Sequence, residues 1–121
     1  MSGVTKKSFA SPDELRAPDK SEIRVVDLGG VKAAQIVFQP GWRWSECIKP
    51  VVGTDSCQVH HEGTLLQGRL HVAHDDGTEM EIVPGDAYVV YPGHDAWVVG
   101  DEAVVGLEFD SGAAETYARP D

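Results

Sequence analysis

The sequence predicts an all-β domain of the sandwich or barrel type, and two observations predict it. From residue 23 onward the chain is a series of about eight short runs rich in β-branched and aromatic residues, each ending at Gly, Pro or Asp. No stretch carries the 3.6-residue apolar period that indicates an amphipathic helix. Short strands separated by turn residues are typical of β-sandwiches and barrels.

The elements follow one another from an N-terminal arm. Residues 1–22 are polar, and we expect an arm there, with one short helical turn after Ser11-Pro12-Asp13-Glu14. Gly29-Gly30 predicts a two-residue hairpin and Gln67-Gly68 another tight turn. The β-domain is expected over 23–112 and a tail over 113–121. The predicted strands cover residues 23–28, 31–38, 58–66, 69–74, 78–83, 87–91, 96–99 and 103–109.

Length and composition are those of one globular domain. The chain has 121 residues, of which 41% are hydrophobic and 25% charged, enough for a core without disulfide or metal staples. The two cysteines, Cys47 and Cys57, are too few for a disulfide scaffold. No apolar run approaches the ~20 residues of a membrane span, and residues 1–20 lack the apolar core of a signal peptide. We therefore expect a cytoplasmic protein.

The charge is strongly acidic. Twenty acidic side chains stand against ten basic ones, for a formal net charge of −10. The segment from Leu70 to Asp121 holds twelve acidic residues and one basic residue, Arg119. Such a field repels phosphate backbones and anionic lipid surfaces. We therefore expect neither a nucleic-acid partner nor a membrane partner.

Two segments carry a known pair of motifs. Residues 84–97 resemble the second conserved motif of the cupin superfamily, with Gly85 and Gly93 at its glycine positions and Tyr91 where its first proline stands. Residues 61–68 resemble the end of the first cupin motif, in which His61 takes the position of a glutamate. Together with Pro40-Gly41, the resemblance covers residues 36–110.

The resemblance implies an architecture and an assembly. Cupins are jelly-roll barrels, also described as double-stranded β-helices, which agrees with the strand series read from the residues. Small single-domain cupins imply a homodimer, in which exposed sheet edges and the arm pair across subunits. The ligand pocket is expected at the barrel mouth.

A metal site like the family's would need substitute ligands here. Metal-binding cupins use two histidines of an H-x-H, the glutamate of the first motif and a histidine of the second. The last of these falls at Ala96, and the H-x-H aligns either with Cys47 and Lys49 or with Asp55 and Cys57. Neither alignment supplies two histidines.

A substitute ligand set is chemically reasonable. Cys47 or Cys57, together with His61 and His94, suits zinc or another late first-row metal. We consider a divalent ion (zinc, iron, manganese or nickel) and, alternatively, no cofactor. On a continuous strand the α-carbons of Cys57 and His61 would lie ~13 Å apart, too far to share one ion unless residues 53–56 bend the chain.

The five histidines divide between the interior and the surface. His60 and His61 are adjacent, so on a strand only one enters the barrel, and the cupin alignment favours His61. His61 is therefore the candidate catalytic base, its alternative being a buried neutral imidazole hydrogen-bonded to a neighbour. His71 and His74 are expected at the surface, because Leu70 and Val72 occupy the core face.

Aromatic residues near position 43 are candidates for ligand binding. In an extended segment Trp42 and Trp44 lie on one side and Arg43 on the other. They could form an aromatic wall, with Arg43 or Lys49 available for a carboxylate and Tyr91 added to the wall. Alternatively, both tryptophans fill the core or a dimer interface.

Three functions remain open from the sequence. The first is a small-molecule-binding cupin, metal-dependent through irregular ligands, with oxygenase, lyase or isomerase activity. The second is a metal-free isomerase or epimerase, with His61 as base and a tyrosine as acid. The third is a ligand-binding module without turnover. Neither cysteine has a recognisable nucleophilic motif, so each is expected to be an inert thiol.

Overall fold

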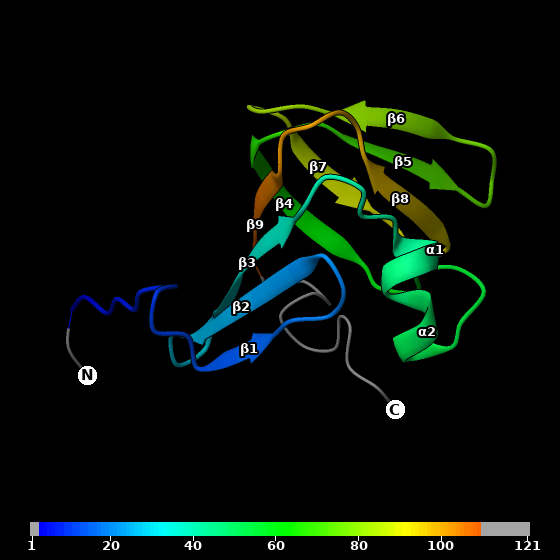
Figure 1. The fold of residues 1–121 in the computed structure, drawn as a ribbon. Helices are drawn as coiled ribbons and strands as arrows, with labels where there is room; N and C mark the ends of the chain where they lie inside the picture. The colour runs from blue at the N-terminus through cyan, green and yellow to red at the C-terminus, as the bar shows by residue number, and fades with distance from the viewer. Residues whose placement is uncertain (1–2, 110–121) are drawn as a thin grey trace.

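The computed structural model describes residues 3–109 and is built almost entirely of β-strands (Figure 1). Two short helices lie between the third and fourth strands. The elements are β1 (Glu14–Arg16), β2 (Ser21–Asp27), β3 (Lys32–Phe38), α1 (Trp44–Cys47), α2 (Lys49–Val52), β4 (His61–Gln67), β5 (Leu70–His74), β6 (Glu79–Ile82), β7 (Ala87–Val90), β8 (His94–Val98) and β9 (Val104–Phe109).

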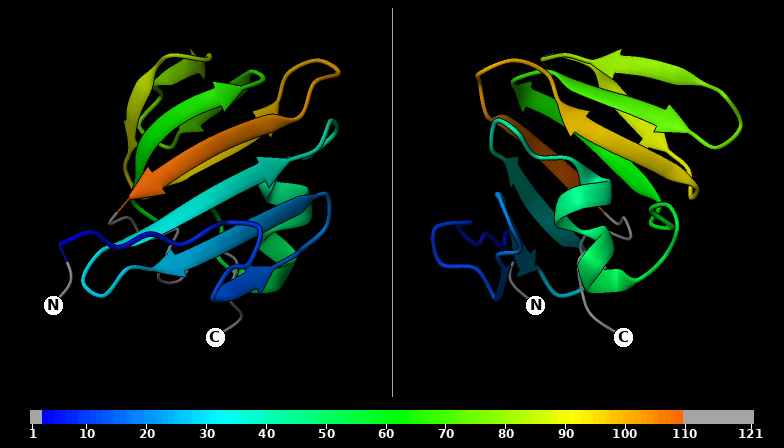
Figure 2. Two further views of the ribbon diagram at one scale, coloured as in Figure 1. Left: turned by 90° about the vertical axis from the view of Figure 1, so that its left-hand side faces the viewer. Right: turned by 45° about the vertical axis from the view of Figure 1, so that its right-hand side comes forward.

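The strands form two antiparallel sheets, as the prediction of a jelly roll requires. The larger sheet has the order β1-β2-β3-β9-β4-β7, and the smaller one has the order β6-β5-β8. Consecutive strands β4 and β5 belong to different sheets, so the predicted tight turn at Gln67-Gly68 carries the chain across the roll and does not form a hairpin. Figure 2 shows the strands of the larger sheet side by side with the smaller sheet facing them.

The predicted hairpin at Gly29-Gly30 joins β2 and β3. Both glycines have positive φ, 86° and 145°, which a residue with a side chain rarely adopts. The register pairs Asp27 with Lys32 next to the turn. The turn chemistry therefore sets the register of this hairpin, as the sequence indicates.

The helices α1 and α2 were not predicted. Asp95 at the start of β8 accepts a hydrogen bond from the Ser45 N–H at 3.1 Å, so a residue fifty positions away caps α1. Trp44 starts this helix, and the expectation of an extended segment through Trp42 and Trp44 is wrong there. Gly53, with φ 79°, ends α2.

The core lies between the two sheets and is closed at one end by α1. Trp42 stacks on Phe38 with ring centroids 3.8 Å apart, and Ile48 is fully buried beneath the helices. Both Trp42 and Trp44 are buried, so they pack as core residues as well as lining a cavity described below. Burial alternates along β8 and β9, which is the period of a half-buried strand.

Part of the predicted arm belongs to the sheet. Glu14–Arg16 form the edge strand β1, paired with β2, where a helical turn was expected. Strand β2 also begins at Ser21, two residues before the predicted start. The predicted tail, 113–121, lies outside the described residues.

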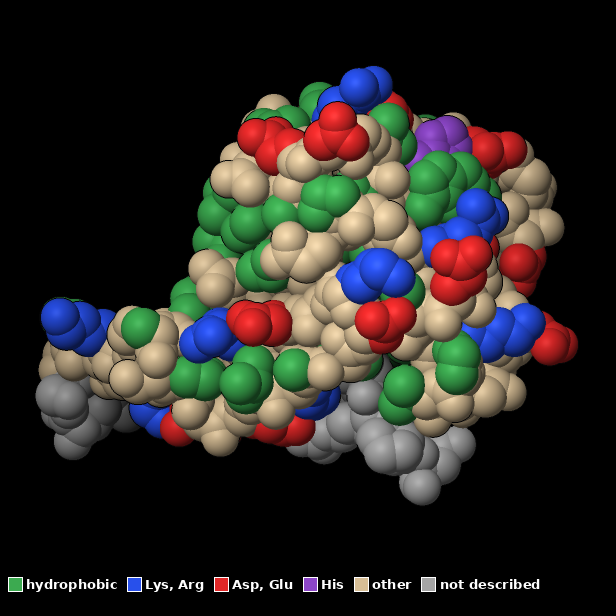
Figure 3. All heavy atoms as spheres, viewed as in Figure 1, with side chains coloured by type: hydrophobic (Ala, Val, Ile, Leu, Met, Phe, Trp, Pro, Cys, Tyr) green, Lys and Arg blue, Asp and Glu red, His purple; other side chains and the backbone are tan. Residues whose placement is uncertain are grey.

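The surface shown in Figure 3 mixes acidic, basic and hydrophobic side chains over the strands. Several opposite charges at the protein surface are paired, as in the 2.8 Å contact between Arg69, just before β5, and Glu81 of β6. Within residues 3–109, no helix is long and apolar enough to cross a membrane.

Candidate metal centre

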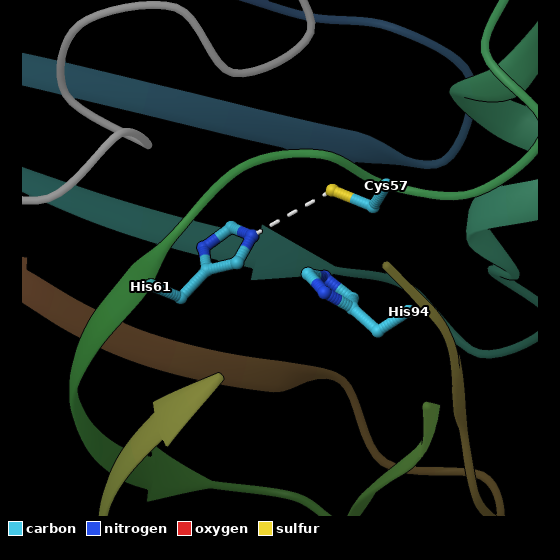
Figure 4. A group of neighbouring side chains, drawn as sticks. All are labelled: Cys57, His61 and His94. Carbon is cyan, nitrogen blue, oxygen red and sulfur yellow. Dashed lines mark hydrogen bonds between the residues drawn. The ribbon is translucent and has the colours of Figure 1, made fainter. Parts of the chain in front are cut away.

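Three potential ligand side chains meet inside the roll. Cys57, His61 and His94 are each less than 10% exposed, and one ligand atom from each lies within 4.8 Å of the other two. Figure 4 shows the Cys57 thiol directed at the His61 ring, with His94 beside both. The Cys57 Sγ to His61 Nε2 distance is 3.9 Å, and the two imidazole centroids are 5.2 Å apart. This is the only such cluster of His, Cys, Asp and Glu among the residues that the structure describes.

Cys57 reaches the cluster from a segment outside any strand, for which the distance estimate for a continuous strand made no prediction. Cys57 is outside any strand but forms an isolated bridge with His94, in which the Cys57 N–H donates to the His94 carbonyl at 2.7 Å. Strand β4 starts only at His61, and residues 58–60 belong to no strand. The ~13 Å separation of a continuous strand therefore does not apply, and the structure has bends at residues 55–56, within the 53–56 segment considered from the sequence.

Each histidine has its second ring nitrogen engaged. The His61 Nδ1 lies 2.9 Å from a Glu108 carboxylate oxygen, and the His94 Nδ1 lies 2.9 Å from the Tyr91 carbonyl. A carbonyl only accepts, so Nδ1 of His94 carries the proton, and a carboxylate imposes the same on His61. Metal-binding histidines are typically held in this way, with Nε2 left as the ligand atom.

Glu108 is a buried carboxylate that our reading of the sequence missed. It is 3% exposed and accepts a second hydrogen bond, from the Tyr88 hydroxyl at 2.8 Å. The alternation of β9 carries the signal, because Val104 and Gly106 face inward and Glu108 continues that face. A charged residue on the inward face of a strand is a signal, readable from the sequence, for a buried functional site.

Buried charges dominate the electrostatics of this cluster. Burial would raise the pKa of Cys57, but hydrogen bonds from His61 and His94 outweigh it and lower the pKa to about 6. Burial would lower the pKa of His61, but the Glu108 carboxylate and the Cys57 thiolate raise it to about 10. In the metal-free protein these shifts favour a Cys57 thiolate beside a His61 imidazolium, whose other ring nitrogen contacts Glu108.

The donor set fits a divalent metal ion. Thiolate and imidazole are the ligands of tetrahedral zinc sites, whose bonds of about 2.0–2.3 Å place ligand atoms roughly 3.3–3.8 Å apart. The three ligand atoms lie within 4.8 Å of one another, so they need to close by at most about 1.5 Å to reach that spacing. With the metal in place of the His61 proton, the two buried anionic groups, Cys57 and Glu108, face a compensating charge.

A small cavity adjoins the two histidines. It has a volume of about 40 Å³, and its walls include Trp42, Trp44, His61 and His94, four of the residues expected around the pocket. Ala96, which stands where cupins place a ligand histidine, also lines it. A water needs about 10–15 Å³, so the cavity has room for an ion with roughly two or three waters but is too small for a larger organic molecule.

Several other predicted site residues lie elsewhere. Cys47 is buried in α1 outside the cluster, and burial raises its pKa, so the choice between the two cysteines falls on Cys57. Arg43 stacks over Trp97, with its guanidinium carbon 4.3 Å from the ring centroid, and pairs with Asp95. Lys49 starts α2, and neither basic side chain lines the cavity.

The remaining histidines and Tyr91 lie toward the surface. His60 points away from the interior, as the inward placement of the adjacent His61 predicts, and it contacts Glu62 at 3.0 Å. His71 stacks on Trp97, and His74 donates to the Pro92 carbonyl at 2.9 Å. Tyr91 is 63% exposed, and only its backbone carbonyl contacts the cluster.

The fold has counterparts among solved structures. A sugar phosphate isomerase of the cupin superfamily from Silicibacter pomeroyi is 20% identical over 86% of this chain and 73% of its own, with a TM-score of 0.59. A mutant of Bacillus subtilis oxalate decarboxylase is 17% identical over 93% of this chain and 30% of its own, with a TM-score of 0.63. A cupin-like protein from Thermotoga maritima is 14% identical over 74% of this chain and 66% of its own, with a TM-score of 0.51.

These likenesses show that the chain has the cupin fold, which confirms the sequence resemblance. The chain spans about two thirds of the Thermotoga protein and less than a third of the decarboxylase. No family model and no curated protein matches the sequence. At these identities the likeness concerns the fold, so function is argued from the residues of the site.

Proposed function

We propose that this cupin is a metal-dependent enzyme acting on a small organic molecule, with zinc held by Cys57, His61 and His94. The observation that carries the proposal is the orientation of both imidazoles, each with Nδ1 engaged by an acceptor and each close to the same thiol. Three protein ligands leave a fourth position open, as in catalytic zinc sites.

The ligand types narrow the choice among zinc, iron, manganese and nickel. Manganese prefers carboxylate and water oxygen, and the non-haem iron oxygenases use two histidines with a carboxylate. Here the nearest carboxylate, Glu108, is bonded to a ring nitrogen of His61 and serves to orient that ring. The thiolate therefore favours zinc.

Zinc favours the isomerase and lyase alternatives over oxygenase chemistry. The ion has no redox chemistry, and when bound it polarises a carbonyl or hydroxyl oxygen as a Lewis acid. Glu108 accepts a hydrogen bond from the His61 Nδ1–H, and Tyr88 donates to the second carboxylate oxygen, so these contacts orient the imidazole ring. Similar folds that serve as a sugar phosphate isomerase and an oxalate decarboxylase support this class of reaction.

The test is metal binding by matched variants. We expect protein purified without an affinity tag to bind one Zn²⁺ or Co²⁺ per chain, with a thiolate-to-cobalt charge-transfer band. Cys57→Ser should abolish that band while Cys47→Ser retains it, and His61→Ala should lose the metal while His60→Ala keeps it. A chain that binds no metal after supplementation, or loses it equally in the control variants, contradicts the proposal.

A second candidate is metal-free catalysis, which the hydrogen-bonded line of Cys57, His61 and Glu108 favours. These groups have the nucleophile, base and orienting acid order of a cysteine hydrolase. Since His61 is protonated at neutral pH in this state, it would act as an acid before it could act as the base we expected from the sequence. Activity that survives a chelator but not Cys57→Ser would select this alternative.

A further inference from the structure

A second, larger hollow lies beside the metal centre. It has a volume of about 800 Å³ and runs between β6 and β7, each of which is the edge strand of its sheet. This volume is within the range of sites for small organic ligands, roughly 300–1,000 Å³. We call it the β6–β7 groove.

The groove and the metal-centre cavity share part of their walls. Val72, Tyr88 and Val90 line both. Tyr88 also donates its hydroxyl proton to Glu108, which in turn holds His61. A molecule seated in the groove therefore lies against side chains that also line the metal-centre cavity.

The groove has an apolar surface exposed to solvent. Met80 on β6 is 66% exposed, Val89 on β7 is 49% exposed, and Tyr91 just beyond β7 is 63% exposed. Exposed side chains of this size on two facing sheet edges are suited to an apolar group of a ligand.

The charge of the groove is acidic without a basic counterpart. Among the described residues that line it there is neither Lys nor Arg, while Asp76, Glu81 and Asp86 contribute carboxylates. Arg69 pairs with Glu81 from outside the groove, and backbone N–H groups of Thr78 and Val83 bond to the two aspartates.

The one histidine among the described residues of the groove already has partners at both ring nitrogens. His74 accepts from the Asp76 N–H at its Nδ1 and lies 2.9 Å from the Pro92 carbonyl at its Nε2. Its Nδ1 also lies 3.2 Å from an Asp76 carboxylate oxygen, so a positive charge on this ring would be paired within the groove. The described part of the groove therefore offers an anion no unpaired cationic side chain, and the chain's net charge of −10 opposes anions further.

We propose that the β6–β7 groove binds the substrate of the metal centre and that this substrate is an uncharged or cationic organic molecule with an apolar part. The statement that this ligand is a substrate rests on the proposed function. The groove's ligand class follows from its own walls. The groove itself disfavours carboxylates and phosphate esters, since no Lys or Arg lines it among the described residues.

Three probes of one shape and different charge test the ligand class. In the full chain labelled with nitrogen-15 and kept metal-free, we expect 2-phenylethylamine and 2-phenylethanol to shift amide signals of β6 and β7. Phenylacetate should bind at least about tenfold more weakly than the amine. Met80→Lys, which keeps a long aliphatic stem and adds a cation, should reverse the preference toward phenylacetate. Leu66→Lys, at an exposed leucine outside both hollows, should leave it unchanged.

Four results would overturn the ligand class. They are phenylacetate binding as tightly as the amine, shifts that lie away from β6 and β7, no shift with any probe, and groove signals that change only with protein concentration. The last would mean that a second copy of the chain occupies the groove.

A separate measurement tests the link to the metal. Co²⁺ loaded on the same protein should broaden the proton signals of bound 2-phenylethylamine. If Co²⁺ binds and the probe is not broadened, the groove does not serve the metal centre. If Co²⁺ does not bind, the proposed function fails while the groove result stands.

Discussion

At the scale of single residues, the site depends on a carboxylate that touches no ligand atom of the proposed metal. Glu108 accepts hydrogen bonds from the His61 Nδ1–H and from the Tyr88 hydroxyl, so both of its carboxylate oxygens are engaged. Partners of this kind fix the tautomer and raise the basicity of the ligand ring. Metal affinity should therefore respond to substitution of a residue that hydrogen-bonds to a ligand side chain and does not itself bind the metal.

Replacing Glu108 tests this dependence. Glu108→Gln should weaken zinc binding by roughly 10–100-fold, because the amide holds the His61 N–H less strongly than a carboxylate. The measurement is competition with a chelator of known affinity. Glu62→Gln is the matched control, since Glu62 contacts the outward His60. Equal affinities for the two variants would contradict the role given to Glu108.

The titration of Cys57 is a second prediction at this scale. Its pKa of about 6 in the folded, metal-free protein lies below the ordinary thiol value of 9.0, so the thiolate should appear as the pH rises through about 6. The ultraviolet absorbance of the thiolate measures this, and Cys57→Ser should lack the step. Cys47 provides the internal control, because burial raises its pKa. A single step near or above 9 would contradict the prediction.

The ionisation of Cys57 also makes stability depend on pH. A lowered pKa contributes stability that is complete above the unfolded value and is lost as the pH falls through the folded value. The stability advantage of the metal-free wild type over Cys57→Ser should therefore shrink as the pH falls from about 9 to about 6.

At the scale of elements, β4 approaches β9 more closely than a side chain allows. A β-carbon added at Gly63 would collide with the Leu107 carbonyl oxygen and come within 2.8 Å of the Glu108 side chain. The glycine therefore lets the two strands that carry His61 and Glu108 lie side by side.

Gly63→Ala should therefore destabilise the fold. We expect a loss of about 1–3 kcal/mol or more, as for overpacked interiors, measured by urea denaturation. Gly3→Ala should change little, because nothing lies within 4 Å of that position. A Gly63→Ala protein as stable as the Gly3→Ala protein would show that the strands can separate without cost.

The strands could be predicted from the sequence because their signals are local. Alternation and turn glycines gave most strands to within a few residues, and the motif alignment placed His61 inside. Helix α1 could not be predicted in this way, because its cap is supplied by Asp95 across the fold. Helix α2 did carry a local signal, with Pro50 near its start and Gly53 at its end.

The candidate ligands depended on contacts that no local pattern reports. Cys57 joins the cluster through its bridge to His94, so neither spacing nor alternation could choose it over Cys47. Glu108, by contrast, could have been found by continuing the inward face of β9 past Gly106.

At the scale of the whole molecule, we expect a homodimer formed through the edge strand β1. This strand pairs with β2 on one side, and Leu15 on it is 50% exposed. Wild-type protein should sediment as a dimer at micromolar concentration and Leu15→Lys as a monomer. Leu66→Lys is the control, since Leu66 is similarly exposed on β4. A monomeric wild type, or a dimer unaffected by Leu15→Lys, would contradict this prediction.

The bridge between Cys57 and His94 has a consequence for how this protein can change. Main-chain groups alone form it, with the Gly93 and His94 N–H groups both donating to the Cys57 carbonyl. Substitution at either position alters the donor atom offered to an ion and leaves the crossing of the chain in place. Substitutions at positions 57 and 94 can therefore change which metal the site prefers while the backbone stays the same, which makes this centre a favourable starting point for directed evolution.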